Sequence, residues 1–298
     1  MKHRHNRPRR RIIAAVFSLT AGLLLAPVAG WAHENQTPAA EGSAHGPYVF
    51  GVVPQFESRK LHAIWQPLLR EVAKRTGIEI DLAPNDSIPE FERDFAAGRF
   101  DFAYMNPYHA LMAFGSQGYL PIIHDGSAPL FGILVVPKDS PIRDVMELNG
   151  SRIAFPAPNA LGASLLMRTD LARLHGVSFE PTYKQTHSSV YLHVIKGIDD
   201  VRAGGGVMGT FKSQKPEIRD QLRILYQTRP MPRHPIVAHP RVPAEVVRAV
   251  TRAFLDLGAE EAGSQMLRRV PIQQVKVTSL AEFQPMQAWG LDAFVVRD

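Results

Sequence analysis

The sequence of 298 residues contains no cysteine. This absence excludes a disulfide framework, a thiolate metal site, a cysteine nucleophile and the cysteine-linked anchor of a lipoprotein. The sequence also lacks a Walker A motif, a dinucleotide-binding glycine pattern, a G-x-S-x-G elbow and any H-x-x-x-H spacing. Ser164, His187, Ser188 and Asp125 are the residue types of a catalytic triad, but no motif supports one. We therefore expect no enzymatic activity and no cofactor.

Positive charge is not in excess once the first 32 residues are set aside. These residues hold six of the 34 lysines and arginines and none of the 28 acidic residues, so 28 of each sign remain. The net charge of +6 therefore belongs to the N-terminal segment. It gives no support for a nucleic-acid partner.

The N-terminal segment has the pattern of a signal peptide. A basic start is followed by an apolar run over residues 12–26, which is short for a membrane span, and by Gly30-Trp-Ala32 as a cleavage site. We expect residues 1–32 to direct export and the mature protein to be soluble in the periplasm. A retained signal anchor is the alternative, and either the Sec or the Tat route is open. Residues 33–46 are small and polar, which predicts a disordered lead-in.

Strand and helix patterns alternate along the rest of the chain. Apolar strand-like runs over residues 48–53, 78–82, 100–105 and 120–124 are separated by helical spacings. In the first of these helices Pro67 is expected to cause a kink or to mark the first turn. The alternation resumes over residues 130–226, with a helix between Ser140 and Gly150 and a longer one over 160–175. The chain ends in helices at 242–257, 260–268 and 280–294. This alternation predicts an α/β fold with mostly parallel sheets covered by helices.

Several motifs, in this order, resemble the phosphonate/phosphite/phosphate-type binding proteins of ABC transporters, a family of type 2 periplasmic binding proteins. They are Gly51-Val-Val-Pro54, Trp65-Gln-Pro-Leu-Leu69, Gly98-Arg-Phe-Asp-Phe-Ala-Tyr104 before Asn106-Pro-Tyr108, Leu148-Asn-Gly-Ser-Arg-Ile-Ala-Phe155, His187-Ser-Ser-Val190, and Gly204-Gly-Gly-Val207 with Thr210-Phe211. The likeness covers nearly all of residues 48–294.

The resemblance implies two lobes joined by two crossover strands, each lobe a mostly parallel sheet flanked by helices. Lobe 1 would comprise residues 47–128 and 236–298, and lobe 2 residues 129–235. One small ligand would bind in the cleft between the lobes, and a monomer would deliver it to an ABC permease in the inner membrane. A sensor of the same fold that signals to a membrane histidine kinase is the alternative partner arrangement.

The family's ligand positions can be transferred one residue at a time. The resemblance implies ligand contacts from Tyr108, beside the helix cap Asn106, and from His187, beside Ser188. From the residues alone, Tyr108 could instead be a core aromatic, and His187 could equally be a surface or capping side chain. The strand-to-helix loop of lobe 2 contributes Asn159, Ala160, Leu161, Gly162 and Ala163. Gln55, after the first strand, and Arg233 and His234, on the return crossover, complete the predicted set.

The loop departs from the family pattern, because Asn159-Ala-Leu-Gly162 stands where serines and threonines are usual. Each missing hydrogen bond to a charged ligand costs about 1.5–3 kcal/mol. The loop therefore favours a smaller, less charged or more apolar relative of the phosphate, phosphite and phosphonate oxyanions. A metal site from histidines and methionines, such as His109, His124, Met105 and Met208, is a further alternative with no spacing to support it.

Overall fold

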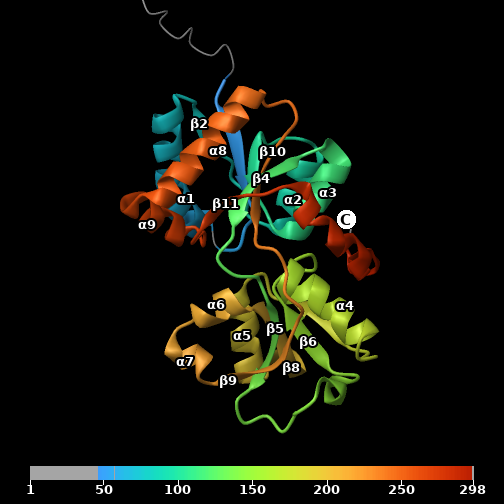
Figure 1. The fold of residues 1–298 in the computed structure, drawn as a ribbon. Coiled ribbons are helices and arrows are strands. Elements are labelled where there is room, and N and C mark those ends of the chain that lie inside the picture. The colour runs from blue at the N-terminus through green and yellow to red at the C-terminus, as the bar shows by residue number, and fades with distance from the viewer. Residues whose placement is uncertain (1–45, 57, 297–298) are drawn as a thin grey trace, which may run out of the picture. The chain divides into compact units, whose positions relative to one another are not determined.

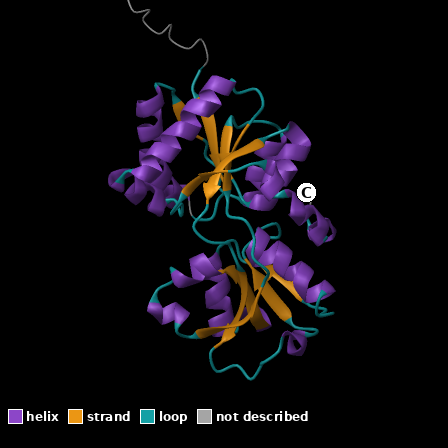
Figure 2. Ribbon diagram, in the orientation of Figure 1, coloured by secondary structure: helices purple, strands orange, loops and turns teal. Residues whose placement is uncertain are grey.

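The computed structural model describes residues 46–56 and 58–296. The predicted signal peptide, and the lead-in except for Gly46, lie outside the described residues. Two β-sheets with flanking helices make up the described chain, as Figures 1 and 2 show. Within this part of the chain, no helix combines the length and the apolar character that crossing a bilayer requires.

The first sheet has six strands in the order β11-β4-β10-β3-β1-β2. They are β1 (Tyr48–Val52), β2 (Ile80–Leu82), β3 (Phe102–Tyr104), β4 (Leu120–Asp125), β10 (Pro235–Ala238) and β11 (Val275–Val277). β1 lies between β2 and β3 and is parallel to both, whereas β10 is inserted antiparallel between β3 and β4. β1 and β3 are almost wholly buried because helices cover both faces of the sheet.

Five helices cover this sheet. α1 (Ser58–Thr76), α8 (Ala244–Ala259) and α9 (Glu261–Arg269) lie on one face, and α2 (Ile88–Ala96) and α3 (Pro107–Gln117) on the other (Figure 1). Local sequence sets their limits. Ser87 caps α2 by accepting from the Glu90 N–H, and Asn106 caps α3 by accepting from the His109 N–H at 2.8 Å. α3 ends at Gly118, which adopts the left-handed conformation.

The second sheet has five strands in the order β7-β6-β8-β5-β9. They are β5 (Gly132–Pro137), β6 (Arg152–Phe155), β7 (Glu180–Tyr183), β8 (Val201–Val207) and β9 (Leu222–Gln227). β6 is parallel to β7 and β8, and β5 is antiparallel to β8 and β9. α5 (His187–Lys196), α6 (Met208–Lys212) and α7 (Pro216–Arg219) lie on one face, and α4 (Leu166–Arg173) on the other (Figure 2).

The chain passes between the sheets twice, from β4 to β5 and from β9 to β10. The two crossing segments pair through Leu130 and Met231, whose backbones exchange hydrogen bonds of 2.8 and 2.9 Å. Four described strands of each sheet run in one direction, and the reversed strands are β10 and β11 in the first sheet and β5 in the second. The predicted two-lobed α/β fold is therefore confirmed, with mixed sheets. The residue limits of the lobes stay a prediction.

The structure corrects three local predictions. Pro67 lies inside α1, which begins at Ser58, so it does not mark the first turn. The helix expected between Ser140 and Gly150 is one 3₁₀ turn (Val145–Leu148), because the capping box forms at Asp144 and not at Ser140. The pattern read as a helix over 280–294 forms three 3₁₀ turns: Leu280–Glu282, Gln284–Trp289 and Leu291–Phe294.

Glycine and proline explain the broken C-terminal helix. Pro285 removes a backbone donor from the second turn, and Gly290 adopts a left-handed φ of 72° before the third. Residues 280–294 are predicted to belong to lobe 1, but the folded segment contacts both lobes. Its Phe283, Met286 and Leu291 share one buried apolar cluster with Tyr108 and Leu111 of α3 and with Leu161, Leu165 and Leu166 of the second sheet's helix.

Candidate binding cavity

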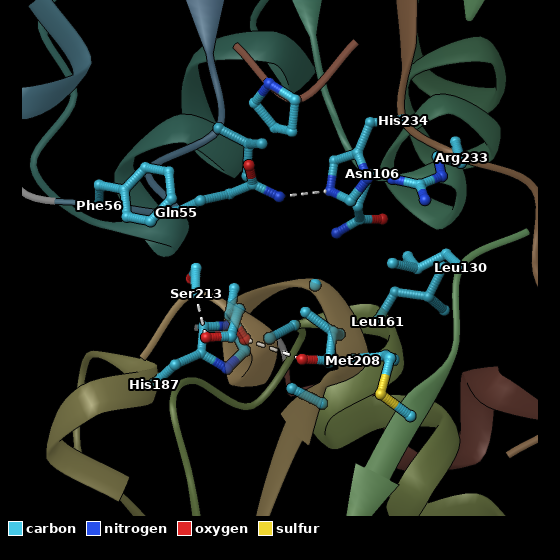
Figure 3. A pocket seen from close by; sticks show the side chains of 18 of the residues that line it. Gln55, Phe56, Asn106, Leu130, Leu161, His187, Met208, Ser213, Arg233 and His234 are labelled. Carbon is cyan, nitrogen blue, oxygen red and sulfur yellow. Dashed lines mark hydrogen bonds between the residues drawn. The ribbon is translucent and has the colours of Figure 1, made fainter. Parts of the chain in front are cut away.

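A cavity of about 730 Å³ lies between the two sheets (Figure 3). Most of its lining comes from the segments that follow the carboxyl ends of β1, β3, β6, β7 and β8 and from both crossing segments, and α1, α2, α9 and the residues after α9 supply the rest. Residues just beyond the carboxyl ends of parallel strands form the usual ligand sites of α/β folds. Volumes of roughly 300–1,000 Å³ are typical of small-molecule sites. Position and size together make this cavity the candidate binding site.

On the side of the first sheet, Gln55 and His234 form a bonded pair. Gln55 Nε2 lies 2.8 Å from His234 Nε2, and the ring of His234 stacks on Tyr104 with centroids 5.3 Å apart. Burial, with His109 and Arg233 nearby, lowers the pKa of His234 to about 3. The imidazole is therefore neutral at pH 7, and with Nε2 accepting from Gln55 it carries its proton on Nδ1. Burial also raises the pKa of Tyr104, so its phenol stays protonated.

Asn106 also faces this side of the cavity. Its Oδ1 is occupied as the cap of α3, which leaves the amide N–H₂ as the group that can donate to a ligand. The cap thus fixes both the start of the helix and the orientation of the amide.

On the opposite side, the loop after β6 presents backbone rather than side-chain donors. Ala160, Leu161, Gly162 and Ala163 all line the cavity, where a π turn (Leu161–Leu165) precedes α4. The N–H groups of the first turn have no carbonyl one turn earlier to bond, so they remain available to an anion. The turn starts without a side-chain cap, because Ala160 occupies the N-cap position.

Glycines let this loop sit directly on the sheet. A Cβ at Gly132 would lie 2.1 Å from the Gly162 carbonyl oxygen, and one at Gly205 would lie 1.9 Å from the Ala163 carbonyl oxygen. The run Gly204-Gly-Gly206 is therefore explained by close packing, with Tyr191 filling the space beside Gly206. The loop position depends on these missing side chains.

His187 reaches the cavity from the start of α5. Its Nδ1 is buried and has no hydrogen-bond partner among the described residues. Burial lowers the pKa of His187 to about 4, so the ring is neutral at pH 7. Gln185, two residues earlier, also lines the cavity and has a left-handed φ of 67°, a conformation that costs a residue other than glycine about 1–3 kcal/mol.

Hydroxyl groups absent from the loop are supplied by α6 and the residue that follows it. Thr210 and Ser213 line the cavity, and their hydroxyls donate to the carbonyls of Val207 and Thr210 at 3.0 and 2.9 Å. The oxygens keep lone pairs, and the hydroxyl hydrogens can rotate toward a ligand. Thr210 lies just after the glycine-rich strand β8, and a hydroxyl at this position could have been predicted to reach the cavity from the sequence.

The charged side chains that line the cavity are all positive among the described residues. Lys60, Lys212, Arg233, Arg268 and Arg269 line the cavity, and no carboxylate does so among the described residues. Arg233 is the least exposed of these cations. Its Nε donates to the Ala128 carbonyl at 2.6 Å and lies 3.5 Å from the buried carboxylate of Asp125. Only Arg233 was predicted. The other cations come from three separate parts of the sequence and converge through the fold.

Nine of the twelve predicted site residues line the cavity: Gln55, Asn106, Ala160, Leu161, Gly162, Ala163, His187, Arg233 and His234. Three do not. Tyr108 is buried in the apolar cluster of the C-terminal segment, and its hydroxyl donates to Asp292. Ser188 points its hydroxyl to Gln214 Oε1 at 3.1 Å.

Asn159, the third, holds the C-terminal segment and does not line the cavity. Its Nδ2 donates to the Val296 carbonyl at 2.8 Å and to Glu92 Oε2 at 2.9 Å, and its Oδ1 accepts from the Val296 N–H at 3.0 Å. In this structure Asn159 therefore anchors the loop, and the ligand role predicted for it stays a prediction that the cavity lining does not support.

Across the described residues, no three histidine, aspartate or glutamate side chains form a group that could hold an ion. His109 is bonded to Glu92 at 2.8 Å, away from the cavity, and Met105 is fully buried in the core. Ser164, Ser188 and Asp125 likewise each bond other groups: Arg168, Gln214 and Ser127.

Comparison with known proteins places the whole arrangement in one family. The model for the phosphonate periplasmic substrate-binding proteins of ABC transporters matches residues 50–283. The phosphonates-binding periplasmic protein of Escherichia coli K12 is 22% identical over 259 residues, covering 80% of this chain and 77% of that protein.

Solved structures share the fold. A binding protein component of an ABC phosphonate transporter from Pseudomonas aeruginosa has a TM-score of 0.71 at 16% identity, covering 82% of this chain and 85% of that one. PhnD1 from Prochlorococcus marinus, solved with methylphosphonate, has a TM-score of 0.74 at 14% identity, covering 83% and 97%.

Proposed function

Because the chain belongs to the phosphonate periplasmic substrate-binding proteins of ABC transporters, we propose that it binds an oxyanion of the phosphate, phosphite or phosphonate class. The ligand would occupy the cavity between the two sheets and be delivered to an ABC permease in the inner membrane. Residues 1–32 would direct export to the periplasm. Two relatives support this ligand class. The Escherichia coli protein is a phosphonates-binding protein, and the Prochlorococcus marinus protein was solved with methylphosphonate.

The observation that carries the proposal is the charge of the cavity lining. Five cations and no carboxylate line it among the described residues, although acidic and basic residues are equally numerous beyond residue 32. An anion in the cavity is attracted by Arg233, the least exposed of these cations, and more weakly, because solvent screens them, by the four exposed ones. This lining favours an oxyanion over the less charged ligand that the hydroxyl-poor loop alone suggested.

The neutral donors would fix the orientation of the oxyanion. Backbone N–H groups of Leu161, Gly162 and Ala163 would meet it from the second sheet, and the Gln55–His234 pair and Asn106 from the first. The ring of His187, which lines the cavity and has no hydrogen-bond partner among the described residues, would bond the ligand. Charge-assisted hydrogen bonds of this kind are about twice as strong as neutral ones.

Binding would be coupled to a rotation of the lobes about the two crossing segments. Leu130 and Met231 tie these segments together by two hydrogen bonds, so they can bend as one unit. A ligand that touches both lobes stabilises the closed state in proportion to its stronger contacts there. The permease would then recognise the closed form.

A thermal-unfolding screen of the purified protein tests the proposal. Phosphate, phosphite and methylphosphonate are compared with acetate, succinate and divalent metal ions. We expect at least one of the three oxyanions to raise the Tm, because a ligand at 100 times its Kd stabilises the folded state by about 2.7 kcal/mol. A response to divalent metals alone would contradict it.

A further inference from the structure

Four of the cavity's cations form a separate group at its mouth. We call Lys60, Lys212, Arg268 and Arg269 the mouth cations; all four residues are exposed, whereas the side chain of Arg233 is only 23% exposed. They come from three helices: Lys60 from α1, Arg268 and Arg269 from α9, and Lys212 from α6. Figure 1 shows α1 and α9 of the first lobe on the same side of the molecule as α6 of the second.

The mouth lies at one end of the cavity, away from the crossing segments. Figure 3 shows Phe56 and Ser213 at one end, and Leu130 and Met208 at the other, where the crossing segments run. The Lys60 Nζ lies 3.6 Å from the centre of the Phe56 ring, and Lys212 precedes Ser213 directly. The mouth cations therefore stand at the end of the cavity that Phe56, Ser213 and His187 line, opposite the crossing segments.

Most of these cations lack acidic partners. The side chains of Lys212 and Arg269 have no hydrogen-bond or ion-pair partner among the described residues, and the side chain of Lys60 lies over the Phe56 ring. Arg268 pairs with Glu261 at 3.1 Å, but both side chains are exposed and such pairs contribute little. Elsewhere in the described chain some cations are paired, as Arg99 is with Asp94 and Lys184 with Asp199, and others are not, but only the mouth cations gather on one cavity.

The cavity is also larger than one oxyanion. Methylphosphonate has only a few heavy atoms, whereas a volume of about 730 Å³ is within the range that holds drug-sized molecules. A ligand whose phosphonate group meets Gly162 and His187 therefore has room to extend toward the mouth.

We propose that the mouth cations form a second anion subsite, and that the substrate is an organic phosphonate or phosphate with a second anionic group a few bonds away. This inference deepens the proposed function and rests on it. The second group lies between Lys212 of one lobe and Arg268 and Arg269 of the other.

The subsite makes closure selective. Like charges on the two lobes repel as the lobes approach, so a ligand with a neutral tail leaves that repulsion in place. A carboxylate or second phosphate at the mouth replaces repulsion by attraction to both lobes. A cationic tail adds to the repulsion, which excludes aminoalkylphosphonates.

Three ligands of similar length separate these cases in calorimetric titrations of the purified protein. They are 3-phosphonopropionate, its neutral amide, and 3-aminopropylphosphonate, with methylphosphonate as the reference. We expect 3-phosphonopropionate to bind at least about tenfold more tightly than its amide, because one charge-assisted hydrogen bond separates the two ligands. The amine should bind most weakly.

The double variant K212Q/R269Q locates the effect. It should abolish the preference for 3-phosphonopropionate over the amide, and it should weaken methylphosphonate far less than 3-phosphonopropionate, because only the second ligand carries an anionic group to the mouth. K138Q/R202Q, which removes two exposed cations outside the cavity lining, is the matched control and should keep the preference.

Three outcomes would overturn the inference. If methylphosphonate binds but the acid and the amide bind equally, the second subsite is absent and the proposed function stands. If K212Q/R269Q weakens all four ligands equally, the mouth cations attract any anion and form no second subsite. If no phosphonate binds, the inference fails; if phosphate and phosphite also fail to bind, the proposed function fails with it.

Discussion

Asn159 and Val296 bind each other through two hydrogen bonds, one in each direction between the side-chain amide and the backbone, of 2.8 and 3.0 Å. The contact ties the ligand loop to the C-terminal segment, 137 residues later in the chain. Arg168 reinforces it, since its guanidinium donates to the carbonyls of Pro158 and Phe294 at 2.7 and 2.6 Å. The C-terminal segment therefore holds the back of the loop whose front faces the cavity.

The variant N159A should lower the free energy of unfolding by about 2–4 kcal/mol, because it removes two bonds to Val296 and one to Glu92 at a buried position. Urea unfolding measures this change. N149A, which removes one bond to the Ser178 N–H at the surface, is the control and should cost at most about 1 kcal/mol. Equal losses of unfolding free energy in the two variants would show that the bonds of Asn159 stabilise the protein no more than a single surface hydrogen bond.

The variant G205A should be strongly destabilised, since its Cβ would lie 1.9 Å from the Ala163 carbonyl oxygen and 2.5 Å from the Phe155 ring. Overpacking of this kind costs about 1–3 kcal/mol or more. G209A changes a helical glycine of the same cavity lining with no atom within 4 Å of the new Cβ. It should be neutral or slightly stabilising in the same urea experiment. A tolerated G205A would disprove the close contact between loop and sheet.

Acidification should destabilise the protein, in the absence of added ligand, through His187 and His234. Burial lowers their pKa values to about 4 and about 3, so from about pH 6.5 downward the unfolded chain binds protons that the folded protein excludes. Their contribution is complete above about pH 6.5 and is lost as the pH falls toward those folded-state values. Each histidine should cost about 1–2 kcal/mol at about pH 5.

Variants that keep the polar contacts but cannot titrate isolate this effect. H187N retains an amide near the position of Nδ1, and H234Q retains an acceptor for Gln55. Between about pH 7.5 and pH 5, the double variant should lose less stability than the wild-type protein in urea unfolding. An unchanged pH dependence would assign it to other groups.

Local sequence patterns predicted much of the fold, because capping and periodicity act over a few residues. The caps Ser87 and Asn106 lie where the patterns put them, and α2 ends just before Gly98. Local sequence patterns gave the wrong secondary structure, or none, where packing against distant parts of the chain determines it. The apolar spacing over 280–294 is satisfied by three 3₁₀ turns against two lobes, and the edge strand β11 has only three residues and little pattern.

The site was predictable to the extent that it is built from loops at strand ends. Gln55 follows a predicted strand, His187 precedes a predicted helix and His234 lies on the predicted return crossover, and all three line the cavity. Asn159 lies outside the lining, because sequence position cannot tell which way a loop side chain faces. The mouth cations were missed because they converge from three separate helices only in the folded chain.

The most direct test of an oxyanion site in the cavity is a calorimetric titration of methylphosphonate into the wild-type protein and the variants H187A and H187N. We expect one bound ligand, a loss of about tenfold or more in H187A, and substantial recovery in H187N, because the amide of asparagine restores a hydrogen-bond donor to this side of the cavity. Y108F, whose hydroxyl contacts Asp292 outside the cavity, should bind like wild type. Equal affinity in the wild-type protein and H187A, or a loss confined to Y108F, would contradict an oxyanion site at this position.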